Sequence, residues 1–299
     1  MGIKKVSVIG LGTMGTQISI QAAHYGFGVT AYDQDPLVFQ RMIEKLKGIM
    51  AFLKRSPTMP KDEWEKAADK IRMAKSLEEC LSQADLVIEG IPENLELKRA
   101  LFAQMDGIAP KGTIFATNSS SIPVSRIESA TRRPERCLNL HFYAPCISWN
   151  IVDIMPGTRT DPDVLHSVRE FVRSIQCIPL TVHKEILGFC FNSVWRAIKR
   201  QTLYLWGEGF VDFRDIDRSW MVMFTPTHGP FFMMDLIGLD VVWDIEMSYY
   251  NESKDPKDIP PKALKEKIER KELGVKTGKG FYTYPNPEFG QPGFLSGRG

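Results

Sequence analysis

Short apolar runs alternate with helical periods along the first part of the chain. Residues 6–9 (VSVI) are apolar and β-branched, which is typical of a strand buried on both faces of a parallel sheet. Residues 13–24 then place apolar side chains at helical spacing, and β character returns at 28–32. Further strands are expected at 85–91, 113–118, 137–143, 150–155 and 178–182, and helices at 95–108 and 163–175. This alternation predicts an α/β fold with a mostly parallel sheet over residues 1–184.

Three segments depart from this alternation. Residues 36–73 have a helical pattern with a break at 56–60, which predicts a helical arm whose second helix begins near Lys61. From Phe189 on the periods are helical, at 192–208, 215–224, 230–250 and 261–273, so we expect an all-α domain over 185–284 that serves substrate binding or another subunit. The tail, 285–299, is rich in proline and glycine and is predicted to be disordered.

The turn after the first strand has the spacing of a dinucleotide-binding fingerprint. Gly10 permits the tight turn, Gly12 lets the backbone approach a pyrophosphate, and Gly15 allows close packing of helix and strand. The helix N-terminus adds free N–H groups. Asp33 ends the next strand, where a carboxylate accepts hydrogen bonds from a ribose 2′-OH and repels a 2′-phosphate, so NAD is favoured over NADP. Polar residues that follow the strands at 85–91 and 113–118 are further candidates for this crevice.

Composition narrows the class of protein. The 38 basic and 36 acidic residues give a formal net charge of +2, an even balance that favours neither nucleic acid nor an anionic membrane as a partner, although a small polyanionic ligand stays open. Five cysteines without any C-x-x-C indicate neither a disulfide framework nor a metal site, which fits a reducing cytoplasm. The short apolar run near the N-terminus and the lack of a membrane-length run predict a soluble, uncleaved protein.

One histidine stands where acid–base chemistry can be placed. His141 lies at the end of one predicted strand, and Asp153 lies in the next, so the two side chains can face each other. The ordinary pKa of a histidine suits it to act as a general acid or base near neutral pH. The remaining histidines fall in predicted helices or connections. A purely structural histidine is the alternative.

Several stretches in order resemble the L-3-hydroxyacyl-CoA dehydrogenase family, including its diketoreductase, L-gulonate and carnitine dehydrogenase-like branches. They are GLGTMG, Asp33, ADLVIEGIPENLELK, ATNSSSI, LHFYAP with VDIM, KEILGFCFNS, HGPFFMMDLIGLD and GVKTGKGFYTY. The resemblance covers almost the whole chain. It implies a Rossmann-type NAD-binding domain bearing a helical arm, a helical C-terminal domain that forms a homodimer, and NAD-linked oxidation of a 3-hydroxyacyl-CoA in fatty acid metabolism.

The resemblance also implies roles for single residues. It places the catalytic histidine at His141, the carboxylate that orients it at Asp153, and polar substrate contacts at Ser120 and Asn192. Cofactor or thioester contacts fall on the glycine turn and on four more positions: Gly10, Leu11, Gly12, Thr13, Met14, Gly15, Asp33, Glu93, Lys98 and Lys276.

The chain departs from the family pattern near the predicted site. The family usually has glutamate at Asp153 and asparagine at Ala144, and a carboxylate one methylene shorter reaches about 1.5 Å less far. Trp149 and Trp220 add bulk, and Phe52 stands about where the family has a small polar contact to CoA. Acyl-CoA is therefore the leading substrate, a free β-hydroxy or diketo acid is the alternative, and a non-catalytic NAD-binding paralogue is a third hypothesis.

Overall fold

A computed structural model of the 299-residue chain describes residues 2–52, 59–60 and 63–297. The chain divides into two compact units, one ending at Phe191 and the other beginning at Asn192. This division lies a few residues later than the predicted boundary after residue 184. Within the described residues, no helix is both long enough and apolar enough to cross a membrane.

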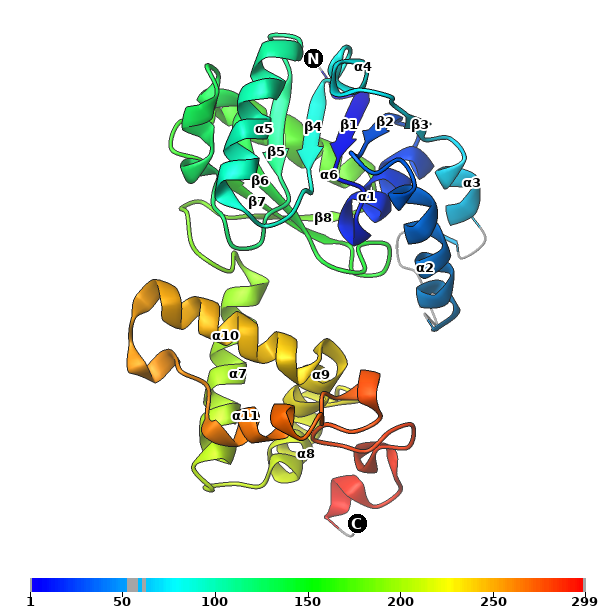
Figure 1. The fold of residues 1–299 in the computed structure, drawn as a ribbon. Coiled ribbons are helices and arrows are strands. Elements are labelled where there is room, and N and C mark those ends of the chain that lie inside the picture. Colours follow the sequence, from blue (N-terminus) through cyan, green and yellow to red (C-terminus); the bar gives the residue numbers. More distant parts are fainter. Residues whose placement is uncertain (1, 53–58, 61–62, 298–299) are drawn as a thin grey trace. The chain divides into compact units, whose positions relative to one another are not determined.

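The first unit is built on one sheet, which has eight strands within the described residues, in the order β3-β2-β1-β4-β5-β6-β7-β8 (Figure 1). Neighbouring strands are parallel except for β6 and β7, which are antiparallel. The strands are β1 (Lys5–Ile9), β2 (Gly28–Tyr32), β3 (Arg72–Met73), β4 (Leu86–Glu89), β5 (Ile114–Thr117), β6 (Cys137–Phe142), β7 (Ile151–Pro156) and β8 (Ile178–Thr181). The predicted α/β fold with a mostly parallel sheet is confirmed.

Alternate side chains of the central strands enter two separate hydrophobic cores, which is why these strands are apolar at almost every position. Val6 and Val8 of β1 pack on one side with α1 (Thr13–His24) and α6 (Pro162–Ser174). Ile9 and Val87 pack on the other side with α4 (Leu77–Leu81) and α5 (Leu95–Ile108). The sheet therefore lies between two helical layers, and the carboxyl ends of its parallel strands are left for a ligand.

The order of the strands creates a switch point between β1 and β4. From β1 the chain continues to β2 and β3 on one side, and the strands from β4 on are added on the other side. Connections that leave neighbouring strands in opposite directions open a crevice at their carboxyl ends, which is where ligands bind in sheets of this kind. The glycine turn that follows β1 lies at this crevice.

The helical arm has the two predicted helices, α2 (Val38–Phe52) and α3 (Trp64–Ala68). Leu46 of α2 and Trp64 of α3 are buried in the same core as α1. Lys61, near which the second helix of the arm was predicted to begin, lies outside the described residues, as does most of the predicted break at 56–60.

The second unit is helical, as predicted, but one predicted helix is divided. Its helices are α7 (Phe191–Gly207), α8 (Phe213–Phe224), α9 (Pro230–Ile237), α10 (Leu239–Ser253) and α11 (Lys262–Glu269). The single helix predicted over 230–250 was wrong because Gly238 adopts φ +102°, outside the helical region, and separates α9 from α10. Glycine reaches this conformation without the steric penalty of a side chain.

The C-terminal tail is packed, in contrast to the predicted disorder. Residues 285–297 include two short 3-10 turns, Glu288–Gly290 and Phe294–Ser296. Phe294 is only 3% exposed and belongs to the core of the second unit, where the Arg218 guanidinium lies over its ring. Phe289 also packs against this core, so aromatic side chains hold a segment whose proline and glycine content alone predicts flexibility.

Candidate active site

The three glycines of the turn after β1 have three different surroundings. Gly10 has φ +87°, and a Cβ on it would lie 2.7 Å from the carbonyl of Gly90, the residue that follows β4. A Cβ on Gly15 would lie 1.9 Å from the carbonyl oxygen of Gly10, so any side chain there would push the helix off the strand. A Cβ on Gly12 would meet no atom within 4 Å. Gly10 and Gly15 are thus needed for packing, and Gly12 leaves open space for a ligand.

The start of α1 is suited to an anion. Gly12 is the N-cap residue, and no side chain of the described residues caps the helix. The first-turn N–H groups, which belong to residues such as Thr13 and Met14, therefore face the open space at Gly12 together with the positive end of the helix dipole. This arrangement fits the pyrophosphate of a dinucleotide.

Asp33 is fixed beside this turn. Its Oδ2 accepts a hydrogen bond from the backbone N–H of Leu11 at 2.7 Å, and its Oδ1 accepts one from the N–H of Asp35 at 2.9 Å. The carboxylate is only partly buried, so each oxygen retains a lone pair that can accept from a ribose hydroxyl. These contacts fit the predicted preference for NAD over NADP.

A cleft of about 310 Å³ extends from the glycine turn across the carboxyl ends of β4 and β5. The residues that line it come from all three strand ends and from α5. They are Gly12, Thr13, Met14, Gly90, Ile91, Glu93, Lys98, Asn118, Ser119 and Ser120. The structure thus brings most of the predicted cofactor residues of the first unit to one cleft.

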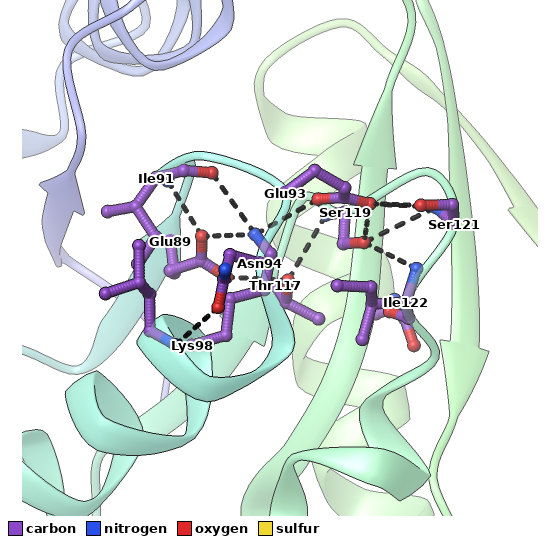
Figure 2. A network of polar contacts seen from close by, with 11 residues as sticks. Glu89, Ile91, Glu93, Asn94, Lys98, Thr117, Ser119, Ser121 and Ile122 are labelled. Atoms are coloured by element: carbon purple, nitrogen blue, oxygen red, sulfur yellow. Dashed lines mark hydrogen bonds and ion pairs between the residues drawn. The ribbon is translucent and has the colours of Figure 1, made fainter. Parts of the chain in front are cut away.

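Lys98 forms the centre of a polar network beside the cleft (Figure 2). Its side chain is only 1% exposed, and its Nζ lies 2.7 Å from Oε1 of Glu89, 3.3 Å from Oε2 of Glu93 and 3.3 Å from the carbonyl of Ile91. Three oxygens therefore surround the three hydrogens of the ammonium. Glu89 is fully buried and also accepts from Thr117 at 2.7 Å. Lys98 and Glu89 form a satisfied buried ion pair that ties α5 to the end of β4.

Glu93 orders the serine turn that follows β5. Its Oε1 accepts hydrogen bonds from the hydroxyl of Ser119 and from the hydroxyl and N–H of Ser121, the last two at 2.6 and 3.1 Å (Figure 2). Burial alone would raise the pKa of Glu93, but these serine hydrogen bonds and the Lys98 ammonium lower it below its ordinary value. Glu93 therefore stays ionised. Ser120 lies between Ser119 and Ser121 in the sequence and is exposed to the cleft.

His141 and Asp153 lie opposite each other in the antiparallel pair β6 and β7, as the sequence predicts. His141 Nδ1 is 3.4 Å from Oδ2 of Asp153, and the two residues are 6% and 0% exposed. The hydrogen bond is long, as catalytic hydrogen bonds often are before substrate binds. When Nδ1–H points at the carboxylate, Nε2 keeps its lone pair and can take a proton.

Two aromatic side chains hold the imidazole. Phe189 stacks on it with ring centroids 4.7 Å apart and an interplanar angle of 3°, and Tyr143 meets it edge-on at 4.6 Å. Phe189 has φ +52°, a conformation that is unusual for a bulky residue and that is retained where the surroundings impose it. Tyr143 also donates its hydroxyl hydrogen to Oδ2 of Asp153.

The pair is on the same edge of the sheet as the cleft. Strand β6 runs parallel to β5, so His141, near the end of β6, lies toward the edge where the serine turn begins. Asn118 connects the end of β6 to the cleft. Its Oδ1 accepts a hydrogen bond from the N–H of Phe142 at 2.8 Å, and the residue also lines the cleft. A base, a hydroxyl-bearing turn and a dinucleotide cleft therefore lie along one sheet edge.

Two predicted site residues belong to the second unit. Asn192 is half-buried in the first turn of α7, and Lys276 forms an ion pair in which its Nζ is 2.6 Å from both carboxylate oxygens of Asp240. Their roles toward the cofactor or substrate stay predictions.

Sequence reasoning missed Glu89, Tyr143 and Phe189. A glutamate inside an otherwise apolar strand is a signal for Glu89, because a buried carboxylate needs a partner. Tyr143 and Phe189 gave no signal, since aromatic residues beside strands are usually core residues.

Comparison with known proteins gives matches over both units. A family model described as 3-hydroxyacyl-CoA dehydrogenase, NAD binding domain, matches residues 5–186, and one described as 3-hydroxyacyl-CoA dehydrogenase, C-terminal domain, matches residues 188–284.

Individual relatives differ in their substrates. A probable 3-hydroxybutyryl-CoA dehydrogenase of Bacillus subtilis is 31% identical over 284 residues, which are 95% of this chain and 98% of the relative. The 5-formyl-3-hydroxy-2-methylpyridine 4-carboxylate 5-dehydrogenase of Mesorhizobium japonicum is 29% identical over 288 residues, 94% of this chain and 91% of that one. A solved diketoreductase that acts on dicarbonyl compounds is 34% identical, with a TM-score of 0.84 over 95% of this chain and 100% of that one.

Proposed function

Because the chain belongs to the 3-hydroxyacyl-CoA dehydrogenase family, we propose that it interconverts an L-3-hydroxyacyl-CoA and the corresponding 3-ketoacyl-CoA, with His141 and Asp153 as the acid–base pair. The chain is an NAD-dependent oxidoreductase with a Rossmann-type NAD-binding domain, which leaves the non-catalytic alternative without support. The main observation behind the proposed chemistry is the register of β6 and β7, which places a buried carboxylate directly behind the only described histidine on that sheet edge.

Different residues of the cleft are proposed to bind different parts of NAD. Asp33 would accept from the ribose, and the open space at Gly12 with the start of α1 would receive the pyrophosphate. Hydrogen bonds to Glu93 hold the serine turn in place beside the cleft. When bound, the nicotinamide accepts the hydride that leaves the carbon of the secondary alcohol.

His141 and Asp153 are proposed to take up the proton of the alcohol. Nε2 of His141 takes the hydroxyl proton as the alcohol is oxidised, and the Asp153 carboxylate stabilises the imidazolium that forms. Phe189 and Tyr143 keep the ring from turning, so the proton is taken at a fixed position. Ser120 and Asn192 are proposed to bind the substrate oxygens, and Lys276 to contact the cofactor or the thioester.

A free β-keto or diketo acid is the second candidate substrate. The diketoreductase relative favours it, as do Asp153 and Ala144, which differ from the family pattern, and the exposed Trp149 in the β6–β7 connection. The test is a spectrophotometric screen of NADH oxidation with acetoacetyl-CoA, longer 3-ketoacyl-CoAs and free 3,5-diketo acids. The highest kcat/KM on a CoA ester supports the first candidate, and turnover restricted to free acids replaces it with the second.

A homodimer and a cytoplasmic location complete the proposal. The described cysteines form no disulfide, and four of them are buried, which fits a reducing compartment.

A further inference from the structure

Three hydrogen-bond donors of the described residues surround the buried Asp153 carboxylate, and His141 is not the nearest of them. The hydroxyl of Tyr143 donates to Oδ2 and lies closer than His141 Nδ1, which is 3.4 Å from the same oxygen. The backbone N–H of Cys190 donates to Oδ1 at 3.3 Å. Asp153 is 0% exposed, so these neighbours rather than water donate the hydrogen bonds that orient its carboxylate.

We infer that Tyr143 is a positioning residue for the His141–Asp153 pair, whose hydroxyl holds the short carboxylate against the imidazole and takes up part of its charge. The inference rests on the proposed function, because it matters only where His141 exchanges a proton with substrate. It also accounts for aspartate in place of the family's usual glutamate: the hydroxyl fixes a carboxylate that reaches about 1.5 Å less far.

A purely structural role explains less of the geometry. A buried phenol needs some acceptor, and any acceptor would satisfy it. Here the acceptor atom is the oxygen that faces His141, and the same tyrosine ring meets the imidazole in a T-shaped contact with centroids 4.6 Å apart. Tyr143 therefore touches both members of the pair, in the manner of residues that orient a reacting group through its partner.

The contacts predict an electrostatic effect. Among the residues that the structure describes, the titratable groups in contact with the imidazole are Asp153 from β7 and Tyr143 after β6, and the stacked ring of Phe189 is neutral. A hydrogen bond from Tyr143 neutralises part of the carboxylate charge, so loss of that bond leaves Asp153 more negative toward His141. The imidazolium is then more stable, and the acid limb of the pH profile for alcohol oxidation moves to higher pH.

The packing predicts a steric coupling. In Asp153→Glu, the carboxylate advances by about 1.5 Å within a site where Tyr143 is only 6% exposed and already in hydrogen-bond contact. The longer side chain therefore crowds the hydroxyl of Tyr143. Removal of that oxygen by Tyr143→Phe makes room, so the effect of Asp153→Glu depends on residue 143.

The test compares the full-length wild-type protein with Tyr143→Phe, Asp153→Glu and the double variant, using the best substrate from the screen. Tyr25→Phe, at the opposite end of α1 from the glycine turn, is the matched control. We expect Tyr143→Phe to lower kcat about tenfold, with little change in KM or NADH affinity, and to shift the acid limb upward. Asp153→Glu should lower kcat by a similar factor alone but raise it in the Tyr143→Phe background.

The inference is overturned if the effects of Tyr143→Phe and Asp153→Glu on kcat are additive, or if Tyr143→Phe lowers kcat without moving the acid limb of the pH profile. Either result would reduce Tyr143 to a packing residue. A gain in kcat from Asp153→Glu in the wild-type background would also overturn it. NADH affinity measured by calorimetry identifies a misfolded variant. The proposed function fails separately, if His141→Ala retains turnover, so the two failures are distinguishable.

Discussion

His141 and Asp153 occupy directly opposed positions of β6 and β7, with Nδ1 and Oδ2 3.4 Å apart. Opposed residues of an antiparallel pair project from the same face of the sheet, so the backbone register brings the carboxylate and the imidazole to the same place. The backbone positions of the pair are therefore fixed by two strands, while the Asp153 side chain is also held by Tyr143 from the connection between them.

Asp33 is predicted to determine the choice of dinucleotide. Asp33→Ala removes the ribose acceptor, the bond to the Leu11 N–H and the charge that repels a 2′-phosphate. NADH affinity should fall about ten- to a hundredfold, as expected for loss of a charged hydrogen bond, and the kcat/KM ratio of NADPH to NADH should rise. Asp35→Ala, in which the backbone N–H is kept, is the control. Wild-type turnover with NADPH that equals or exceeds that with NADH would contradict the assignment.

Glu93 is predicted to support cofactor binding through the serine turn. In Glu93→Gln one amide oxygen can still accept from Ser119 and Ser121, but an NH₂ group replaces the oxygen that faces the Lys98 ammonium. We expect about tenfold weaker NADH binding by calorimetry, because the turn loses an ionic anchor. Glu96→Gln, on the exposed first turn of α5, should bind NADH normally. Equal affinities of the two variants would show that the network plays no part.

The resemblance implies a homodimer through the second unit, and this stays a prediction that needs an exposed surface. Phe231, Met234 and Leu239 are 0% exposed and fill the core of the second unit itself, so they cannot supply that surface. Val222, Met223 and Phe224 at the end of α8 are instead 55%, 75% and 64% exposed. Exposed apolar side chains gathered at one end of a helix are a candidate interaction surface.

Light scattering checks the dimer. We expect the wild-type protein to have twice the 33.9 kDa mass of one chain at micromolar concentration, and the double variant Met223→Glu/Phe224→Glu to have the mass of one chain. Leu37→Glu, which changes an exposed apolar residue of the first unit, should remain dimeric. A wild-type monomer would remove the dimer from the account.

Asp217 should make the stability of the second unit depend on pH. Burial raises its pKa to about 6, despite hydrogen bonds from the N–H groups of Phe231 and Phe232 and the hydroxyl of Tyr282. Because the folded pKa is above the unfolded value of 3.8, folding favours the protonated form, and its contribution to stability is full below about pH 4 and lost as pH rises through about 6.

The expected loss of stability is on the order of 2–3 kcal/mol between pH 4 and pH 7. Urea unfolding at several pH values measures it, with Asp217→Asn as the comparison because the amide does not titrate. The free energy of unfolding of the wild-type protein should fall relative to that of the variant over this window. Parallel curves for the two proteins would contradict the prediction.

The sequence predicted the parts of the fold that local pattern determines. Apolar runs marked the central strands, and the glycine spacing predicted the tight turn between β1 and α1. Local pattern could not divide the predicted helix at Gly238, because its neighbours are apolar on both sides and only tertiary packing decides the backbone angle. Likewise, β3 has two residues, Arg72 and Met73, whose strand geometry comes from pairing with β2.

Residue spacing likewise predicts only part of the candidate site. His141 and Asp153 could be placed together because consecutive antiparallel strands oppose each other in a predictable register. Phe189 could not be predicted, since it comes from a distant connection and reaches His141 only in the folded chain. The contact of Tyr143 with Asp153 depends on side-chain directions that residue spacing does not reveal.

The most direct test of the account is the kcat of His141→Ala, measured with NADH on every substrate of the screen beside the exposed-histidine control His166→Ala. Loss of the acid–base group should lower kcat about 10²–10⁴-fold, while NADH affinity stays close to that of the wild type because the glycine turn and Asp33 hold the cofactor. Wild-type kcat in His141→Ala on all active substrates would contradict the assignment of His141 and Asp153 as the acid–base pair.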